Sequence, residues 1–163
     1  MPRAVIGQGG QYSRGYADRR GCHQVWAETV SVDLDTAWRM IRAAHSEASR
    51  RSVLVSVAVV DAGGHMIAFG RMDGAEIAGP VLAVDKAYTA TANSTSTAEL
   101  AVLAAPGGEL FGLNANNNGR FVIFGGGVPI LAEGKVVGGV GVSGAAVADD
   151  CACAAAALAA LAD

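Results

Sequence analysis

The residue types best suited to chemistry in this sequence lie in the stretch 71–90. A charged turn, RMDG, opens it where a strand is expected to stop, and an apolar helix is predicted to follow. The helix carries Lys86, with Tyr88 two residues later. Because a buried unpaired charge is costly, Lys86 needs either a carboxylate partner or a cavity to face. Both interpretations stay open: a structural ion pair, or a pocket cation for an anionic ligand.

Three consecutive glycines, Gly125, Gly126 and Gly127, form the second candidate site. They lack the Gly-Lys-Ser/Thr ending of a phosphate loop and open no helix. We interpret them as a turn whose exposed backbone N–H groups can receive a carboxylate or an oxyanion. The sequence therefore predicts a ligand pocket between this turn and the apolar helix.

His45 is the third candidate. Apolar residues recur at helical spacing after Asp33, which can cap a helix, and His45 falls on their face, four residues after Ile41. It is either a core histidine with one satisfied ring nitrogen or a pocket histidine that exchanges a proton near neutral pH. Asp73 is likewise either a turn former beside glycine or a functional carboxylate.

The elements that position these residues alternate between helices and strands. A valine-rich run from Val53 to Asp61 is apolar on both faces, which predicts a strand covered on both sides. Ala62-Gly63-Gly64 is a tight turn that makes the next strand its hairpin partner. The other predicted strands are 65–72, 120–124, 130–132 and 136–142, and the predicted helices are 34–51, 80–93, 95–104 and 146–162.

Composition limits the class of protein. The 163 residues predict one domain, and 52% apolar against 17% charged residues predicts a homo-oligomer that buries part of its surface. A formal net charge of −3 argues against a nucleic-acid partner. The longest apolar tract, 152–162, is too short to span a membrane.

The amino-terminal residues 1–30 show no sustained periodicity, and we predict an arm outside the domain 31–163. No secretion signal is apparent in them. Three cysteines, Cys22, Cys151 and Cys153, give an odd count that predicts no disulfide framework. A reducing cytoplasm is therefore the expected location.

Several segments together resemble the GlcG/HbpS family. These are VSVAVVDAGGHMIAFGRMDGA (56–75 at its core), DKAYTA (85–90) and GGGVPILAEGKVVGGVGVSG (125–144), followed by the alanine-rich final helix. The match covers about 32–163. It implies an α+β fold, an α-β-α sandwich around a five-stranded antiparallel sheet of profilin-like type. It also implies a small-molecule pocket near a subunit interface, which different members use for different ligands.

The first functional hypothesis is binding of haem or another tetrapyrrole. The resemblance implies an axial iron ligand, and His45 on the first helix is the position that best matches it. An apolar surround would suit haem, and Arg71 or Lys86 would meet a propionate. Haem is then an exchangeable cofactor, because the cysteine-histidine attachment motif is missing.

The second hypothesis is a cofactor-independent carbon–nitrogen lyase, by resemblance to 4-hydroxylaminobenzoate lyase. Lys86 or Arg120, with the backbone of 125–127, would anchor a carboxylate, and His45, Asp73 or Tyr88 would move protons. No spacing in the sequence selects this arrangement. A third hypothesis is an accessory protein of a catabolic operon.

Overall fold

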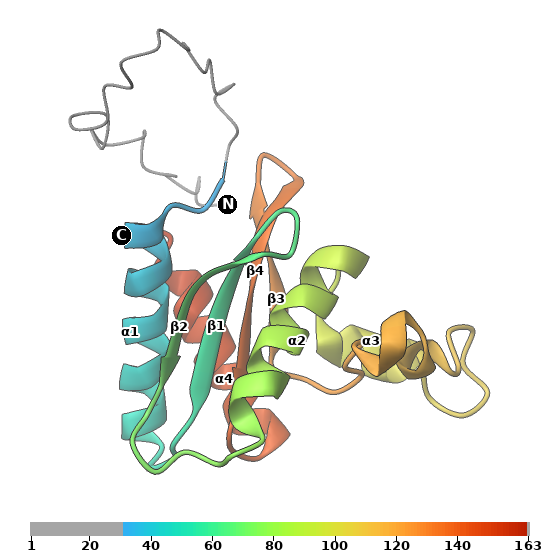
Figure 1. The fold of residues 1–163 in the computed structure, drawn as a ribbon, viewed down its shortest axis with the longest axis horizontal. Helices are drawn as coiled ribbons and strands as arrows, with labels where there is room; N and C mark the ends of the chain where they lie inside the picture. The colour runs from blue at the N-terminus through green and yellow to red at the C-terminus, as the bar shows by residue number, and fades with distance from the viewer. Residues whose placement is uncertain (1–30, 163) are drawn as a thin grey trace, which may run out of the picture.

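Two helices cover one face of an antiparallel sheet and a third helix covers the other face (Figure 1). The computed structural model describes residues 31–162, so the predicted arm 1–30 lies outside the described residues. The helices are α1 (Leu34–Arg50), α2 (Gly79–Asn93), α3 (Thr97–Leu103) and α4 (Val147–Ala159), with two short 3₁₀ turns, η1 (Leu113–Ala115) and η2 (Asn117–Gly119). The strands are β1 (Ser56–Asp61), β2 (Met66–Arg71), β3 (Gly127–Ala132) and β4 (Lys135–Ser143).

The sheet of the described residues has four strands in the order β2-β1-β4-β3, all antiparallel. Val57 shows the register at the centre, because it lies opposite Gly70 of β2 and Val142 of β4. The α+β class and the antiparallel sheet were predicted correctly. The prediction of five strands was wrong.

The segment predicted as the fifth strand, 120–124, lies outside the sheet, and its central N–H group, that of Val122, bonds to a side chain of a helix and not to a neighbouring strand. The Val122 N–H donates to Oγ1 of Thr89 on α2 at 3.0 Å. The Gly127 N–H, which follows, donates to Oγ1 of Thr97 on α3 at 2.9 Å. The segment therefore runs along the helices, and it brings Arg120 and Phe121 to α2.

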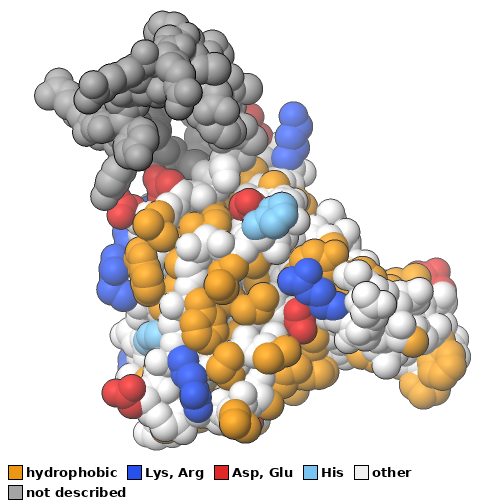
Figure 2. Space-filling view, viewed as in Figure 1, with side chains coloured by type: hydrophobic (Ala, Val, Ile, Leu, Met, Phe, Trp, Pro, Cys, Tyr) orange, Lys and Arg blue, Asp and Glu red, His pale blue; other side chains and the backbone are white. Residues whose placement is uncertain are grey.

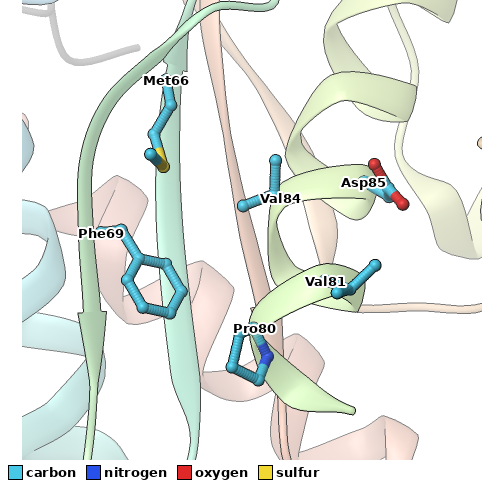
Figure 3. A pocket seen from close by; sticks show the side chains of 6 residues that line it. All are labelled: Met66, Phe69, Pro80, Val81, Val84 and Asp85. Atoms are coloured by element: carbon cyan, nitrogen blue, oxygen red, sulfur yellow. The ribbon is translucent and has the colours of Figure 1, made fainter.

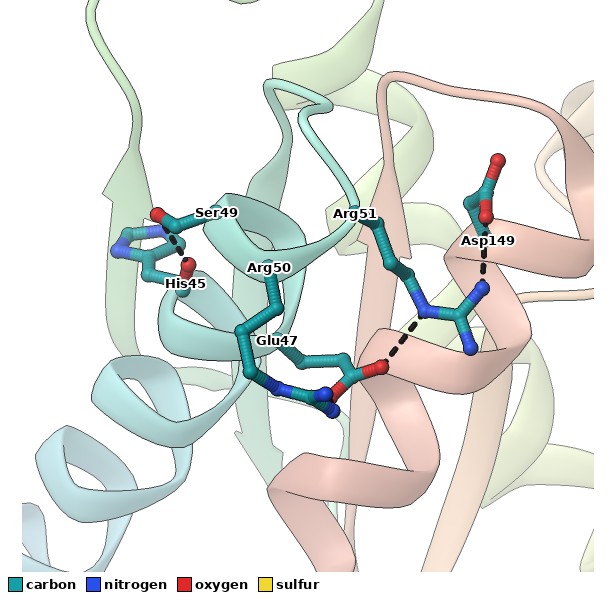
Figure 4. A network of polar contacts seen from close by, with 6 residues as sticks. All are labelled: His45, Glu47, Ser49, Arg50, Arg51 and Asp149. Atoms are coloured by element: carbon teal, nitrogen blue, oxygen red, sulfur yellow. Dashed lines mark hydrogen bonds and ion pairs between the residues drawn. The ribbon is translucent and has the colours of Figure 1, made fainter.

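The main core lies between the sheet and the pair α1 and α4. Asp33 begins α1 by accepting a hydrogen bond from the Thr36 N–H at 2.7 Å, as predicted from its type. Met40 and Ile41 of α1 are buried against valines of β1 and β4. An ion-pair chain also joins the ends of α1 and α4, because Arg51 contacts both Glu47 and Asp149 (Figure 4).

Helix α2 packs closely on the opposite face because small residues meet there. Its Ala83 and Ala87 are fully buried against Gly139 and Gly141 of β4. A Cβ atom at Gly141 would overlap the carbonyl oxygen of Ala83 and would lie 2.5 Å from the nitrogen of Ala87. This close approach fixes the height of α2 above the sheet, and hence the positions of the polar side chains that α2 carries.

Within residues 31–162, no helix is both long and apolar enough to cross a membrane.

Candidate functional site

An apolar groove runs between β2 and α2, with a volume of about 350 Å³. Met66 and Phe69 point from β2 toward Pro80 and Val84 of α2, and Val81 and Asp85 complete the lining (Figure 3). The groove exists because β2 is the edge strand of the sheet, whereas α2 packs mainly over β4 and β1. In Figure 2, hydrophobic side chains gather over this part of the surface.

Charged and aromatic side chains meet at the Asp85 end of the groove. The Nε of Arg120 donates to Oδ1 of Asp85 at 2.9 Å. The guanidinium carbon of Arg120 lies 3.6 Å from the centre of the Tyr88 ring, and the ring of Phe121 stacks on Tyr88 at 6.2 Å. The Tyr88 hydroxyl accepts a hydrogen bond from the side chain of Asn117 at 3.1 Å. Two predicted site residues, Tyr88 and Arg120, thus come together beside the groove.

Lys86 faces the interior of the protein. Its side chain is 0% exposed, and Nζ donates to Oδ2 of Asp150 at 2.7 Å and to the carbonyl oxygen of Val142 at 2.9 Å. The ring of Phe124 lies 4.8 Å from the ammonium group. Burial raises the pKa of the Asp150 carboxyl, and the Lys86 ammonium opposes that shift. The geometry is that of a structural ion pair, and Lys86 is absent from the lining of the groove.

The triple glycine lies next to Lys86. Gly125, Gly126 and Gly127 are all buried, and a Cβ atom at Gly126 would come within 2.9 Å of the Lys86 ammonium nitrogen. The Gly127 N–H is already bonded to Thr97, and Gly127 begins β3. The glycines therefore allow the chain to pass over the ion pair; they do not present a row of exposed N–H groups to solvent.

His45 lies on the other face of β2 from the groove. Phe69 lines the groove, and the next residue, Gly70, packs against the His45 ring. Consecutive residues of a strand point to opposite faces of the sheet, so His45 and the groove lie on opposite faces. Among the described residues, the buried Nε2 of His45 has no hydrogen-bond partner. Burial lowers the pKa of His45, and a polar contact with the Gly70 backbone opposes the shift.

Arg71 is the last residue of β2, and Asp73 lies in the connection from β2 to α2 that follows, at the end opposite the hairpin turn. Arg71 is exposed and donates to the carbonyl oxygen of Ala75, which braces this connection. Asp73 is exposed in the turn. Gly64 of the hairpin turn packs instead on Tyr88, so the six residues of β2, about 20 Å of strand, separate Tyr88 from Asp73.

The predicted site residues thus fall into four places: Tyr88 with Arg120 beside the groove, Lys86 with the glycines inside, His45 behind β2, and Arg71 with Asp73 at and just after the end of β2. Sequence reasoning missed the groove walls, Met66, Phe69 and Val84, which look like ordinary core residues in the sequence. It also missed Asp150 as the partner of Lys86. The need for a carboxylate was the only available signal, because the two residues are 64 positions apart.

The family model described as "Haem degrading protein HbpS-like" matches residues 32–159. The chain belongs to the HbpS-like family. This confirms the resemblance to the GlcG/HbpS family that the sequence motifs indicated.

Solved structures of similar proteins share the fold. The Klebsiella pneumoniae protein ORFY superposes with a TM-score of 0.79 at 34% identity, covering 83% of this chain and 94% of that one. The protein in the crystal structure of a PduOC–haem complex has a TM-score of 0.77 at 37% identity, covering 80% of this chain and 94% of that one.

Among curated sequences, a 15.0 kDa protein from the dhaT–dhaS intergenic region of Citrobacter freundii is 39% identical over 123 residues. The alignment covers 76% of this chain and 87% of that protein.

Proposed function

We propose that this protein binds haem or another tetrapyrrole in the groove between β2 and α2. The observation that carries the proposal is the combination of an apolar groove of about 350 Å³ with an arginine fixed at one end. Such a volume lies within the range of about 300–1,000 Å³ found for small-molecule pockets. The family membership and the PduOC–haem complex of a similar protein support the same ligand class.

The residues present fit a tetrapyrrole in three respects. Phe69, Pro80 and Val84 offer an apolar wall for the flat ring system. Arg120 offers a cation for a propionate at the groove's edge. The groove is open on one side, because Met66 and Val81 are 58% and 65% exposed. A bound ring would therefore exchange with solvent.

Iron in a bound haem would supply a site for an axial ligand, and the groove offers one side chain of that kind. The Met66 thioether lines the groove, and methionine is an established haem ligand. His45 was predicted for this role from the sequence, and its unpartnered Nε2 has the right chemistry. Its place behind β2, however, turns it away from the groove, so we propose Met66 as the ligand.

The lyase hypothesis has weaker support in the geometry. His45, Asp73 and Tyr88 occupy three separate places around β2, so they do not converge on one reacting atom. The accessory role in a catabolic operon requires no particular site geometry, so the geometry gives it no specific support.

A homo-oligomer remains part of the proposal. Two large hydrophobic side chains that are close in sequence, Ile77 and Val81, are 90% and 65% exposed and give the protein an uncovered apolar surface. Such a surface is typical of a protein–protein contact, and light scattering during size-exclusion chromatography would measure the number of copies.

A matched pair of variants tests the proposed function. Val81→Asp places a carboxylate in the groove, at a position near the start of α2 where an acidic residue favours the helix. Val102→Asp makes the same change at a valine of α3 that is 73% exposed and lies outside the groove. We expect hemin titrations to show a Soret shift with the unaltered protein and with Val102→Asp, and a loss of affinity of at least about tenfold with Val81→Asp. Equal affinities of both variants, or no Soret shift with the unaltered protein, would refute the proposal.

A further inference from the structure

We infer that Arg120 makes the groove selective for ligands that carry a carboxylate, with Asp85 and Tyr88 as the residues that position it. This inference rests on the proposed function, but it concerns a separate property, the choice among ligands of similar shape.

Two contacts fix the Arg120 side chain, and the Tyr88 ring that makes one of them is itself held in place. The Nε of Arg120 donates to Asp85, its planar group lies 3.6 Å from the centre of the Tyr88 ring, and Tyr88 itself is held between the hairpin turn at Gly64 and the ring of Phe121. A cation above an aromatic face is favourable and retains its orientation. Little rotational freedom is then left for Arg120 to lose when a ligand binds.

The fixed orientation leaves the two terminal nitrogens of Arg120 available. Within the part of the chain that the structure describes, only Nε has a protein acceptor, and the side chain is 36% exposed. The terminal N–H groups of an arginine match the two oxygens of a carboxylate in a bidentate pair. Asp85 lines the groove, so this cation stands at the groove's end, beside any ligand that fills it.

Asp85 and Tyr88 act through Arg120. Asp85 balances the charge of the guanidinium group in the absence of a ligand and holds it by a single nitrogen. A bound carboxylate would add to this pair without displacing it, because it engages different nitrogens. Lys86, the buried cation of α2, takes no part, because its ammonium group already donates to Asp150 and to the carbonyl oxygen of Val142.

The test compares two metal-free ligands, protoporphyrin IX and its dimethyl ester, which differ only in whether their propionates are charged. We expect fluorescence titration to show the diacid binding the unaltered protein about tenfold more tightly than the diester.

Arg120→Gln should bring the two affinities together by weakening the binding of the diacid. Arg120→Lys should keep only part of the preference, because an ammonium group lacks the planar pair of donors. Tyr88→Phe should keep the preference and Tyr88→Leu should reduce it, which a purely structural role of the ring would not produce. Arg50→Gln, at an exposed arginine of α1, is the matched control.

The unaltered protein distinguishes a failure of selectivity from a failure of binding. If the unaltered protein binds both ligands equally well, the selectivity inference is overturned and the groove remains the binding site. If it binds neither ligand, the proposed function fails and the inference fails with it. The comparison in the unaltered protein needs no variant to fold. An unchanged preference in a folded Arg120→Gln protein would assign the selectivity to another cation and would also overturn the inference.

Discussion

The Lys86 ammonium nitrogen lies 2.7 Å from a carboxylate oxygen of Asp150, and the two side chains are 0% and 3% exposed. The pair joins α2 to the start of α4 beneath the ring of Phe124. Because neither charged group is solvated by water, each is stabilised by the opposite charge of its partner. Lys86, the basic residue that made α2 look like a binding helix, therefore serves the stability of the fold.

Lys86→Met should lower the free energy of unfolding by about 3–5 kcal/mol, since it leaves Asp150 buried without its partner. Urea denaturation monitored by circular dichroism measures this change. Lys135→Met, at an exposed lysine that begins β4, is the matched control and should leave stability nearly unchanged. A small loss of stability combined with a large loss of porphyrin binding would show that Lys86 serves the ligand.

His45 should make stability fall in mildly acidic solution. Burial lowers its pKa in the folded state below the value of 6.5, so below that pH the unfolded chain binds a proton more readily than the folded one. The contribution is present above the unfolded pKa and is lost as the pH falls through the folded pKa. Between pH 7.5 and 5.0, urea denaturation should show a larger loss of unfolding free energy for the unaltered protein than for His45→Gln. His65→Gln, at an exposed histidine, is the control, and equal losses in all three proteins would contradict the expectation.

Gly141→Ala should destabilise the protein by at least about 2 kcal/mol, because the added methyl group meets backbone atoms of α2 that cannot rotate away. The comparison is Gly134→Ala in the β3–β4 turn, where nothing lies within 4 Å and only the positive φ of 78° is unfavourable. That change should cost about 1 kcal/mol. Thermal denaturation of both variants decides the matter, and a Gly141→Ala protein as stable as Gly134→Ala would show that α2 packs less closely than described.

Met66→Leu should change the Soret spectrum of the hemin complex while metal-free protoporphyrin IX still binds, since leucine fills similar space without a ligating sulfur. His45→Gln should leave the spectrum unaltered, because His45 lies behind β2. The reverse result, a spectrum that depends on His45 and ignores Met66, would place the iron beside α1. His45, the axial ligand predicted from the sequence, would then take the place of Met66.

Periodicity and local residue types predicted most of the fold. The cap at Asp33, the hairpin after Asp61 and the apolar helix from Pro80 were all recognisable from short-range patterns. The position of segment 120–124 outside the sheet was not recognisable, because its largely apolar sequence is also typical of a strand. The Val122 N–H donates to Thr89, 33 positions away, and the N–H of Gly127, beyond the segment, donates to Thr97, 30 positions away. Such contacts leave no local pattern.

The candidate site was harder to predict for the same reason. The sequence showed that Lys86 required compensation but did not identify Asp150. It also gave no sign that β2 ends the sheet, and that edge position is what opens a groove beside Phe69. Whether a side chain lines a pocket or fills a core depends on which strand lies next to it.

Mapping the bound ligand onto the protein by nuclear magnetic resonance tests the central claim most directly. Addition of metal-free protoporphyrin IX to ¹⁵N-labelled protein should move backbone amide signals through the ring current of the porphyrin. We expect the largest changes in the segments that line the groove, Met66 to Phe69 and Val81 to Asp85. Changes centred on α1 around His45, or no changes at all, would contradict the assignment of the groove as the binding site.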